Sequence, residues 1–164
     1  MHAACEVIAE VGVGNVTHRL VATRAGVPLG ATTYYFSSLD DLVTAALEHV
    51  SAQTMALLRE WMDRARDTDD LAAVLTALTG EYLADRGRAR VEYELYVAAA
   101  RTPVLRPWAR AWVDGLTDFL SAQVPREAAT AAVALLDGVM LQAVTLDVPL
   151  DHGWLHRALD RCLA

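Results

Sequence analysis

Apolar residues recur along the chain at the three-to-four residue spacing of α-helices. Ala4, Val7 and Ile8 set this spacing near the N-terminus, and it continues with interruptions to the C-terminus. The interruptions fall at glycine, proline or clustered polar residues, which commonly end helices. No segment alternates between apolar and polar residues as a half-buried strand would. We therefore predict an all-α protein.

The interruptions divide the chain into about nine predicted helices. Their approximate ranges are 4–11, 17–25, 28–35, 38–61, 71–87, 89–100, 108–120, 126–146 and 151–162.

Several helix ends near the N-terminus have recognisable signals. Thr17 can cap the second helix through its hydroxyl, and Gly26 suits the left-handed residue that ends it. Pro28 is favoured at the start of the third helix, where its missing N–H costs little. Ser38 and Asp41 resemble a capping box at the start of the fourth. The sequence thus predicts three short helices followed by a long one.

The turn between the second and third helices has the composition of a helix-turn-helix. Two helices that cross steeply need a small residue at the contact, a glycine at the reversal and an apolar residue after it. Ala22, Gly26 and Val27 have this order and spacing. The helix that follows such a turn places its first residues in the DNA major groove. Residues 28–33 are small and offer hydroxyl and methyl groups to base edges.

The same stretch resembles the DNA-binding domain of TetR-family regulators. The similar segments are Leu20–Val27, Gly30, Tyr34–Phe36 and Asp40–Leu42. Beyond about residue 47 the chain is similar only in being helical and of suitable length. The resemblance implies a homodimer, each subunit with a three-helix head, a linking fourth helix and a larger helical domain. We expect a helix-turn-helix DNA-binding domain at 1–47 and a ligand-binding and dimerisation domain at 48–164.

The resemblance also implies which residues contact DNA. Thr17 and Arg19 would contact phosphates at the start of the second helix, and Gly30 would let the backbone approach the DNA. Tyr34 and Tyr35 would reach phosphates through their hydroxyls, whereas Phe36 is expected in the core. The complete predicted set is Thr17, Arg19, Pro28, Leu29, Gly30, Ala31, Thr32, Thr33, Tyr34 and Tyr35.

The charge of this predicted head is unusual for a DNA-binding domain. The chain has a net charge of −7, and its 14 cationic residues are all arginine. Residues 1–47 hold two arginines against four acids, a formal charge of −2. Few phosphate neutralisations predict a shallow dependence of DNA affinity on salt. Hydroxyls and backbone N–H groups should dominate, with only Arg19 or Arg24 for charge.

Aromatic and flexible side chains in the remaining helices are candidates for a ligand cavity. Helical bundles build such cavities from side chains on facing helices. For each candidate, ordinary core packing is the alternative. The candidates are Tyr93, Tyr96, Trp108, Trp112, Phe119, Met140 and Gln142.

The segment 126–146 is rich in alanine and apolar residues, which let helices approach closely. A helix that is apolar on most faces is buried on several sides. We predict that this helix and the last one form half of a four-helix dimer interface, so that a homodimer forms through about residues 126–162. Burial within one subunit is the alternative.

Other chemistry is weakly signalled. His152 and His156 have the spacing of metal ligands on a helix, but no third ligand is evident, so we predict no metal. The sequence has no Ser-His-Asp order, glycine-rich phosphate loop or Cys-x-x-Cys, so we predict no catalytic residues, no enzyme and no cofactor. No run reaches the ~20 apolar residues of a membrane span, and no signal peptide is evident, so we expect a cytoplasmic protein without membrane contact.

Together these patterns predict a DNA-binding transcriptional regulator, a homodimeric repressor of double-stranded operator DNA that a small-molecule effector releases. The alternative is a helical small-molecule-binding or adaptor protein with a vestigial head, which the −2 charge of the head favours. The sequence identifies neither the effector nor the operator.

Overall fold

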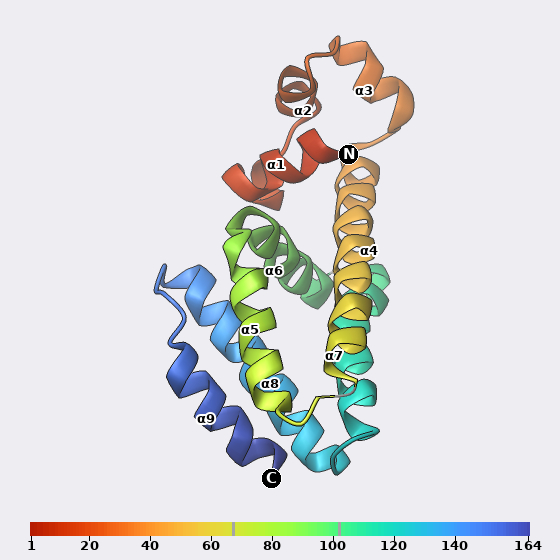
Figure 1. The fold of residues 1–164 in the computed structure, drawn as a ribbon. Helices are drawn as coiled ribbons and strands as arrows, with labels where there is room; N and C mark the ends of the chain where they lie inside the picture. The colour runs from red at the N-terminus through yellow and green to blue at the C-terminus, as the bar shows by residue number, and fades with distance from the viewer. Residues whose placement is uncertain (67, 102) are drawn as a thin grey trace. The chain divides into compact units, whose positions relative to one another are not determined.

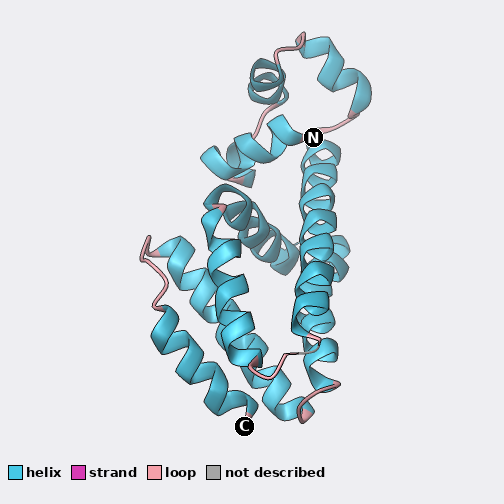
Figure 2. Ribbon diagram, in the orientation of Figure 1, coloured by secondary structure: helices cyan, strands magenta, loops and turns pink. Residues whose placement is uncertain are grey.

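A computed structural model describes residues 1–66, 68–101 and 103–164 of the chain (Figure 1). Across these described ranges the secondary structure is nine α-helices and two short 3₁₀ helices, without a strand (Figure 2). The prediction of an all-α protein with about nine helices is confirmed. The α-helices are α1 (His2–Val11), α2 (His18–Ala25), α3 (Leu29–Tyr35), α4 (Leu39–Ala65), α5 (Leu71–Ala84), α6 (Arg86–Arg101), α7 (Arg106–Ser121), α8 (Arg126–Thr145) and α9 (His152–Leu163).

The predicted helix boundaries differ from the structure mainly between α5 and α6. The sequence places the break near Gly87, whereas α5 ends at Ala84 and α6 begins at Arg86. Asp85 forms the break, with φ −101° and ψ 77°, outside the helical region. The signal at Gly87 is misleading because a glycine can also lie within the first turn of a helix.

The described residues form two compact units. The first unit comprises Met1–Gln53 and Gly87–Ala109, and the second comprises Thr54–Arg86 and Arg110–Ala164. The chain passes between the units within α4, at the start of α6 and within α7. Residues distant in sequence therefore share each core.

The core of the first unit joins α1, α2, α4 and α6. Ile8 of α1 and Leu42 of α4 are at most 1% exposed, and Leu95 of α6 is 3% exposed. Burial of such a side chain contributes roughly 1.5–3 kcal/mol. The core thus includes one helix, α6, that lies far along the chain from the other three.

In the second unit α5, α8 and α9 pack against one another (Figure 1). Small residues bring these helices close: Ala129 and Ala132 of α8 are fully buried. A Cβ on Gly80 of α5 would lie 2.6 Å from Cε1 of His152 on α9. The two helices therefore meet at a position where α5 has no side chain.

Arg86 fixes the end of α8 within the second unit. Its guanidinium donates to the backbone carbonyls of Ala143, at 2.8 Å, and Val148, at 3.2 Å. It also pairs with Asp147 at 3.0 Å, where the backbone has a positive φ of 53°. The last carbonyls of a helix have no partner within it, and the arginine supplies one.

Helix α8 also has the length and composition of a membrane span. The expectation that no segment of the chain qualifies is corrected on this point. Core helices of soluble proteins can have the same length and composition. Here the buried residues of α8, such as Leu136 and Met140, belong to the packed core of the second unit.

Candidate functional site

The turn between α2 and α3 has the geometry that the sequence predicts. Thr17 begins α2, and its hydroxyl accepts a hydrogen bond from the Leu20 N–H at 3.1 Å. Gly26 ends α2 in the left-handed conformation, with φ 67° and ψ 29°. The N–H of Val27 then donates to the Ala22 carbonyl at 3.0 Å, which closes the turn. The predicted cap and the predicted glycine position are both confirmed.

Helix α3 presents most of the predicted contact residues to solvent. Tyr34 and Tyr35 are 83% and 75% exposed, and their rings contact each other edge to face at 5.3 Å. Large aromatic side chains this exposed contribute little to a core, so their position calls for another role. The exposed members of the predicted set are Thr17, Arg19, Pro28, Leu29, Gly30, Thr33, Tyr34 and Tyr35.

Thr32 differs from the others. It is 8% exposed, and its hydroxyl donates to the Leu29 carbonyl at 2.9 Å. Ala31 is half-buried. The hydroxyl of Thr32 therefore lies beneath the surface, which does not suit the predicted contact with a base. Thr33 is exposed, although its hydroxyl lies 3.3 Å from the Gly30 carbonyl.

Arg24 is held within the first unit. Its guanidinium donates to the carboxylates of Glu6, at 3.3 Å, and Glu10, both on α1. The hydrogen bond with Glu10, followed by that with Glu6, raises the pKa of Arg24, and the same contact lowers the pKa of Glu10. Arg24 thus links α1 to α2 with its charge balanced. Arg19 has no carboxylate partner among the residues that the structure describes. The sequence offered Arg24 as an alternative DNA-contacting cation, and in the structure this cation is paired with two carboxylates.

A capping box opens α4 beside the head. The Asp41 N–H donates to the Ser38 hydroxyl, and the Ser38 N–H donates to the Asp41 carboxylate, each at 3.1 Å. The Ser37 hydroxyl donates to the same carboxylate. The hydrogen bonds from Ser37 and then Ser38 lower the pKa of Asp41. The predicted capping box is confirmed, and it sets Leu42 in the core at the first turn of α4.

Helix α6 also supports the head, a contact that periodicity cannot reveal. A carboxylate oxygen of Glu94 accepts a hydrogen bond from the Val13 N–H, just after α1, at 3.4 Å. Val91 and Leu95, from the same helix, are buried in the core of the first unit. An apolar stripe on a helix indicates that this face is buried, but it does not identify the helix that packs against it.

The predicted ligand-binding residues are divided between the two units. The members in the first unit are Tyr93, Tyr96 and Trp108, and those in the second are Trp112, Phe119, Met140 and Gln142. In the first unit the rings of Tyr93 and Tyr96 lie 5.9 Å apart, and Trp108 is 38% exposed. In the second unit Trp112 and Met140 are buried, Phe119 is half-buried and Gln142 is exposed. The structure therefore does not gather all seven residues in one unit.

Trp112 instead belongs to an aromatic cluster with Trp61 of α4 and Tyr82 of α5. Its ring centroid lies 5.3 Å from that of Trp61 and 6.3 Å from that of Tyr82. Trp61 and Tyr82 are 6.4 Å apart, nearly edge to face. Trp61 and Tyr82 are absent from the predicted set of ligand-binding residues. Their large aromatic side chains were the signal that could have included them.

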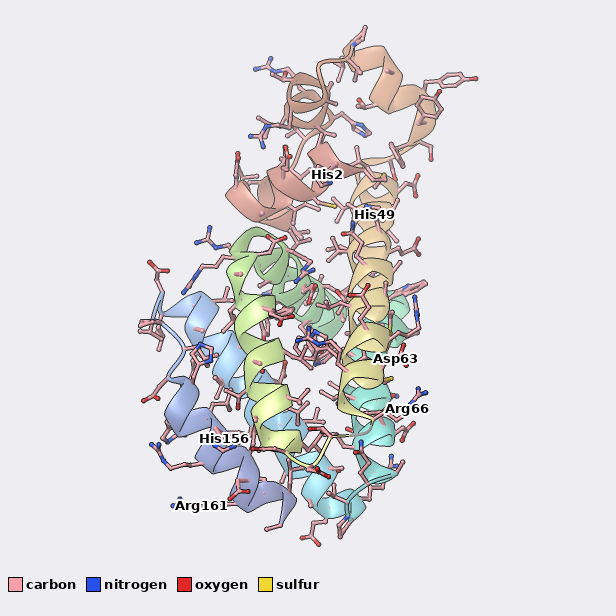
Figure 3. All side chains as sticks on the ribbon, viewed as in Figure 1. His2, His49, Asp63, Arg66, His156 and Arg161 are labelled. Carbon is pink, nitrogen blue, oxygen red and sulfur yellow. The ribbon has the colours of Figure 1, made fainter. Side chains whose placement is uncertain are left out.

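The histidine pair on α9 takes part in helix contacts. Nε2 of His156, labelled in Figure 3, lies 3.3 Å from the carboxylate of Asp70, which caps α5. The ring of His152 packs against Gly80. Over the parts of the chain that the structure describes, no three His, Cys, Asp or Glu residues form a group that could hold a metal ion.

Two family models match this chain. Residues 1–46 match the model of bacterial regulatory proteins of the tetR family. Residues 66–164 match the model of the tetracyclin repressor-like C-terminal domain. The two matches cover the helix-turn-helix and most of the second unit.

Individual proteins are similar along nearly the whole chain. The HTH-type transcriptional regulator BetI of Escherichia coli (strain SE11) is 26% identical, over 94% of this chain and 85% of the relative. The structure of a TetR-family member from Streptomyces coelicolor A3 has a TM-score of 0.87 and 38% identity, covering 99% of this chain and 95% of that one. The multidrug binding protein EbrR complexed with malachite green has a TM-score of 0.82 and 38% identity, with 99% and 95% covered.

A helix-turn-helix head joined to an all-helical second unit defines a transcription regulator with a DNA-binding head. The chain belongs to the TetR family of bacterial regulatory proteins.

Proposed function

We propose that the protein is a homodimeric repressor that binds operator DNA through α2 and α3 and leaves the DNA when a small molecule binds to it. The observation on which the proposal rests is the exposure of Tyr34 and Tyr35 beside a correctly formed helix-turn-helix turn. Two such heads, related by two-fold symmetry, read half-sites roughly 34 Å apart. The proposed DNA-binding domain is 1–47, supported by α6, and 48–164 is the proposed ligand-binding and dimerisation domain.

Contacts with DNA rely on neutral donors more than on charge. Tyrosine hydroxyls and backbone N–H groups at the start of α3 position the head on phosphates. Gly30 has open space around its Cβ position, which suits close approach of the backbone to DNA. Arg19 supplies the positive charge. A dimer doubles these contacts, which compensates for the weak electrostatic attraction of each head to DNA.

The dimer interface we infer lies on α8 and α9. One face of α8 consists of exposed or half-exposed small and apolar residues: Ala131, Ala134, Gly138 and Leu141. On α9, Trp154 is 47% exposed. Apolar surface of this kind, on helices of a family that forms homodimers, suits a second copy of the same chain.

The effector we propose is an aromatic small molecule that binds in the second unit. Support comes from the aromatic cluster of Trp61, Tyr82 and Trp112 and from the similarity to EbrR, which is described in complexes with ethidium and malachite green. A regulator of this kind acts in the cytoplasm, where its operator DNA lies.

Fluorescence anisotropy of labelled DNA from the protein's own promoter tests the proposal. We expect binding at low salt and at least a tenfold loss of affinity in the Tyr34→Phe, Tyr35→Phe double variant, which keeps both rings and removes both hydroxyls. Arg66→Gln is the control, because Arg66 is an exposed cation of the second unit that pairs with Asp63 (Figure 3). Failure of the wild-type dimer to bind this DNA at low salt would contradict the proposal.

Release by effector is tested in the same assay. Addition of malachite green should lower the anisotropy of the DNA complex in a saturable manner and leave that of the labelled DNA alone unchanged. A reporter joined to the promoter should rise in expression when the gene is deleted, and a fall would contradict repression.

A further inference from the structure

The indole N–H of Trp61 is buried without a hydrogen-bond acceptor among the described residues. Trp61 lies in the part of α4 that belongs to the second unit, and its side chain is 1% exposed. Buried tryptophan N–H groups usually have a partner, since an unpaired one costs about 1–3 kcal/mol. The position is therefore unusual for a residue that serves the core alone.

Two aromatic rings pack near the Trp61 ring. The ring centroids of Trp112 and Tyr82 lie 5.3 Å and 6.4 Å from that of Trp61, both at steep angles to it. Trp112 and Tyr82 are tilted by only 31° from each other. Aromatic rings beside one unpaired polar donor are a combination typical of small-molecule sites.

Two flexible side chains of α4 lie beside Gly115 of α7. A Cβ on Gly115 of α7 would lie 3.9 Å from the terminal methyl of Met62 and 4.0 Å from that of Met55. Both methionines are only half-buried. Methionine has three rotatable bonds and adapts to different ligand shapes, so these side chains can move aside for a ligand.

We propose that Trp61 is the polar anchor of the effector site: its indole N–H donates to an acceptor atom of a flat heteroaromatic molecule whose rings pack against Tyr82 and Trp112. The acceptor is a ring nitrogen or a carbonyl oxygen. This inference rests on the proposed function only in requiring that the second unit binds a small molecule.

A matched pair of probes isolates the hydrogen bond. Quinoline and naphthalene have the same fused-ring shape, and only quinoline has a ring nitrogen that accepts. In ¹⁵N-labelled wild-type protein, each of the four tryptophans gives one indole N–H signal, and the Trp61→Phe variant identifies that of Trp61. Under conditions where quinoline is uncharged, we expect quinoline to move the Trp61 signal downfield and naphthalene not to do so. A Trp61 signal that stays unchanged during saturation with quinoline overturns the proposal.

Affinity measurements on variants give a second, independent test. Trp61→Phe should weaken quinoline about tenfold, equivalent to about 1.4 kcal/mol, and leave naphthalene within twofold. Trp154→Phe is the control, since Trp154 is exposed on α9. Circular dichroism verifies that each variant is folded. If Trp61→Phe weakens the affinity for quinoline and for naphthalene equally, Trp61 contributes packing alone and the proposed hydrogen bond is contradicted.

DNA binding by the same preparations separates this proposal from the proposed function. If quinoline shifts the Trp61 signal and the promoter complex stays intact, the hydrogen bond from Trp61 is supported. Release of the DNA by this class of ligand is then contradicted. If malachite green releases the DNA equally from the wild type and Trp61→Phe, and quinoline leaves the Trp61 signal in place, effector release is supported and the role of Trp61 as anchor is contradicted.

Discussion

Two arginines in the head have different roles at the scale of single residues. Both arginines are exposed, but Arg24 is paired with Glu6 and Glu10, while Arg19 at the start of α2 has no carboxylate partner among the described residues. A cation already paired with two carboxylates has little net charge to offer a phosphate. In the proposed DNA complex, the head would therefore offer one effective positive side chain in each subunit.

Substitution of each arginine tests this division. Arg19→Gln should reduce the slope of log affinity against log salt by about two for a dimer, since each phosphate contact contributes roughly 0.9. Arg24→Gln should leave the slope unchanged and lower the thermal midpoint slightly, because it removes the link between α1 and α2. Anisotropy titrations at several salt concentrations measure the slope. A reduced slope in Arg24→Gln would show that Arg24 leaves its carboxylates to contact DNA.

Two glycines of the head should also respond differently to alanine. Gly26 has a positive φ of 67°, so Gly26→Ala should destabilise the protein by about 1 kcal/mol. Gly30 is helical with open space at its Cβ position, so Gly30→Ala should stabilise α3 by roughly 0.5–1 kcal/mol. Because the added methyl would separate the backbone from DNA, Gly30→Ala should still bind more weakly. Urea unfolding and DNA titration on the same samples measure both effects.

Single residues could be predicted where the signal is local. Thr17, Gly26 and the Ser38–Asp41 pair act through neighbours within four positions, and each has its predicted conformation or contact. The burial of Thr32 and the pairing of Arg24 depend on how α3 and α1 are oriented. Helical spacing does not determine that orientation closely enough to place one side chain.

At the scale of elements, caps decide where the helices begin. Asp70 caps α5 by accepting from the Ala73 N–H at 2.8 Å, and it also contacts His156 of α9. One carboxylate thus starts α5 and joins it to α9. The same side chain serves local structure and packing.

This cap predicts a dependence of stability on pH. The hydrogen bond from the Ala73 N–H, and then the contact with His156, lower the pKa of Asp70. Its stabilising effect is therefore complete above the ordinary aspartate pKa near 3.9 and is lost as the pH falls through the lowered value. Asp70→Asn should lower the thermal midpoint at neutral pH, with the difference from wild type shrinking on acidification.

Asp69→Asn is the matched control for this experiment. It removes the same charge from the next position, without the bond to the Ala73 N–H, and should lower the midpoint less at neutral pH. Thermal scans across a pH series measure both variants. An Asp70→Asn midpoint that parallels the wild type at every pH would show that the charge of the cap is unimportant.

Whole helices could be predicted because a long periodic stretch indicates a helix whatever that helix packs against. The helices that pack against one another were harder to predict. The aromatic cluster of Trp61, Tyr82 and Trp112 combines three helices, and periodicity indicates a buried face on each without pairing them. Of the seven predicted ligand-binding residues, only Trp112 belongs to this cluster.

At the scale of the whole molecule, the proposed dimer can be tested by a substitution that leaves the fold of one subunit intact. A Cβ at Gly138 of α8 meets nothing within 4 Å, so one subunit has room for a side chain there. Gly138→Leu should keep the helix content, and should abolish or strongly weaken the dimer because the side chain projects from the proposed interface. Ala56→Leu, exposed on α4, is the control. Sedimentation velocity measures the outcome, and an intact Gly138→Leu dimer would place the interface elsewhere.

The participation of α6 in the core of the first unit limits how the DNA-binding head can be exchanged between regulators of this kind. Val91, Leu95 and Ala99 are buried with Ile8 and Leu42, and Glu94 binds the backbone after α1. A chimera that receives only residues 1–53 loses those partners and exposes apolar surface to water. A transplanted head should keep its packing only if residues 87–109 travel with it. The smallest exchangeable part of this chain is therefore discontinuous, and recombination at a single junction, in evolution or in the laboratory, should rarely preserve it.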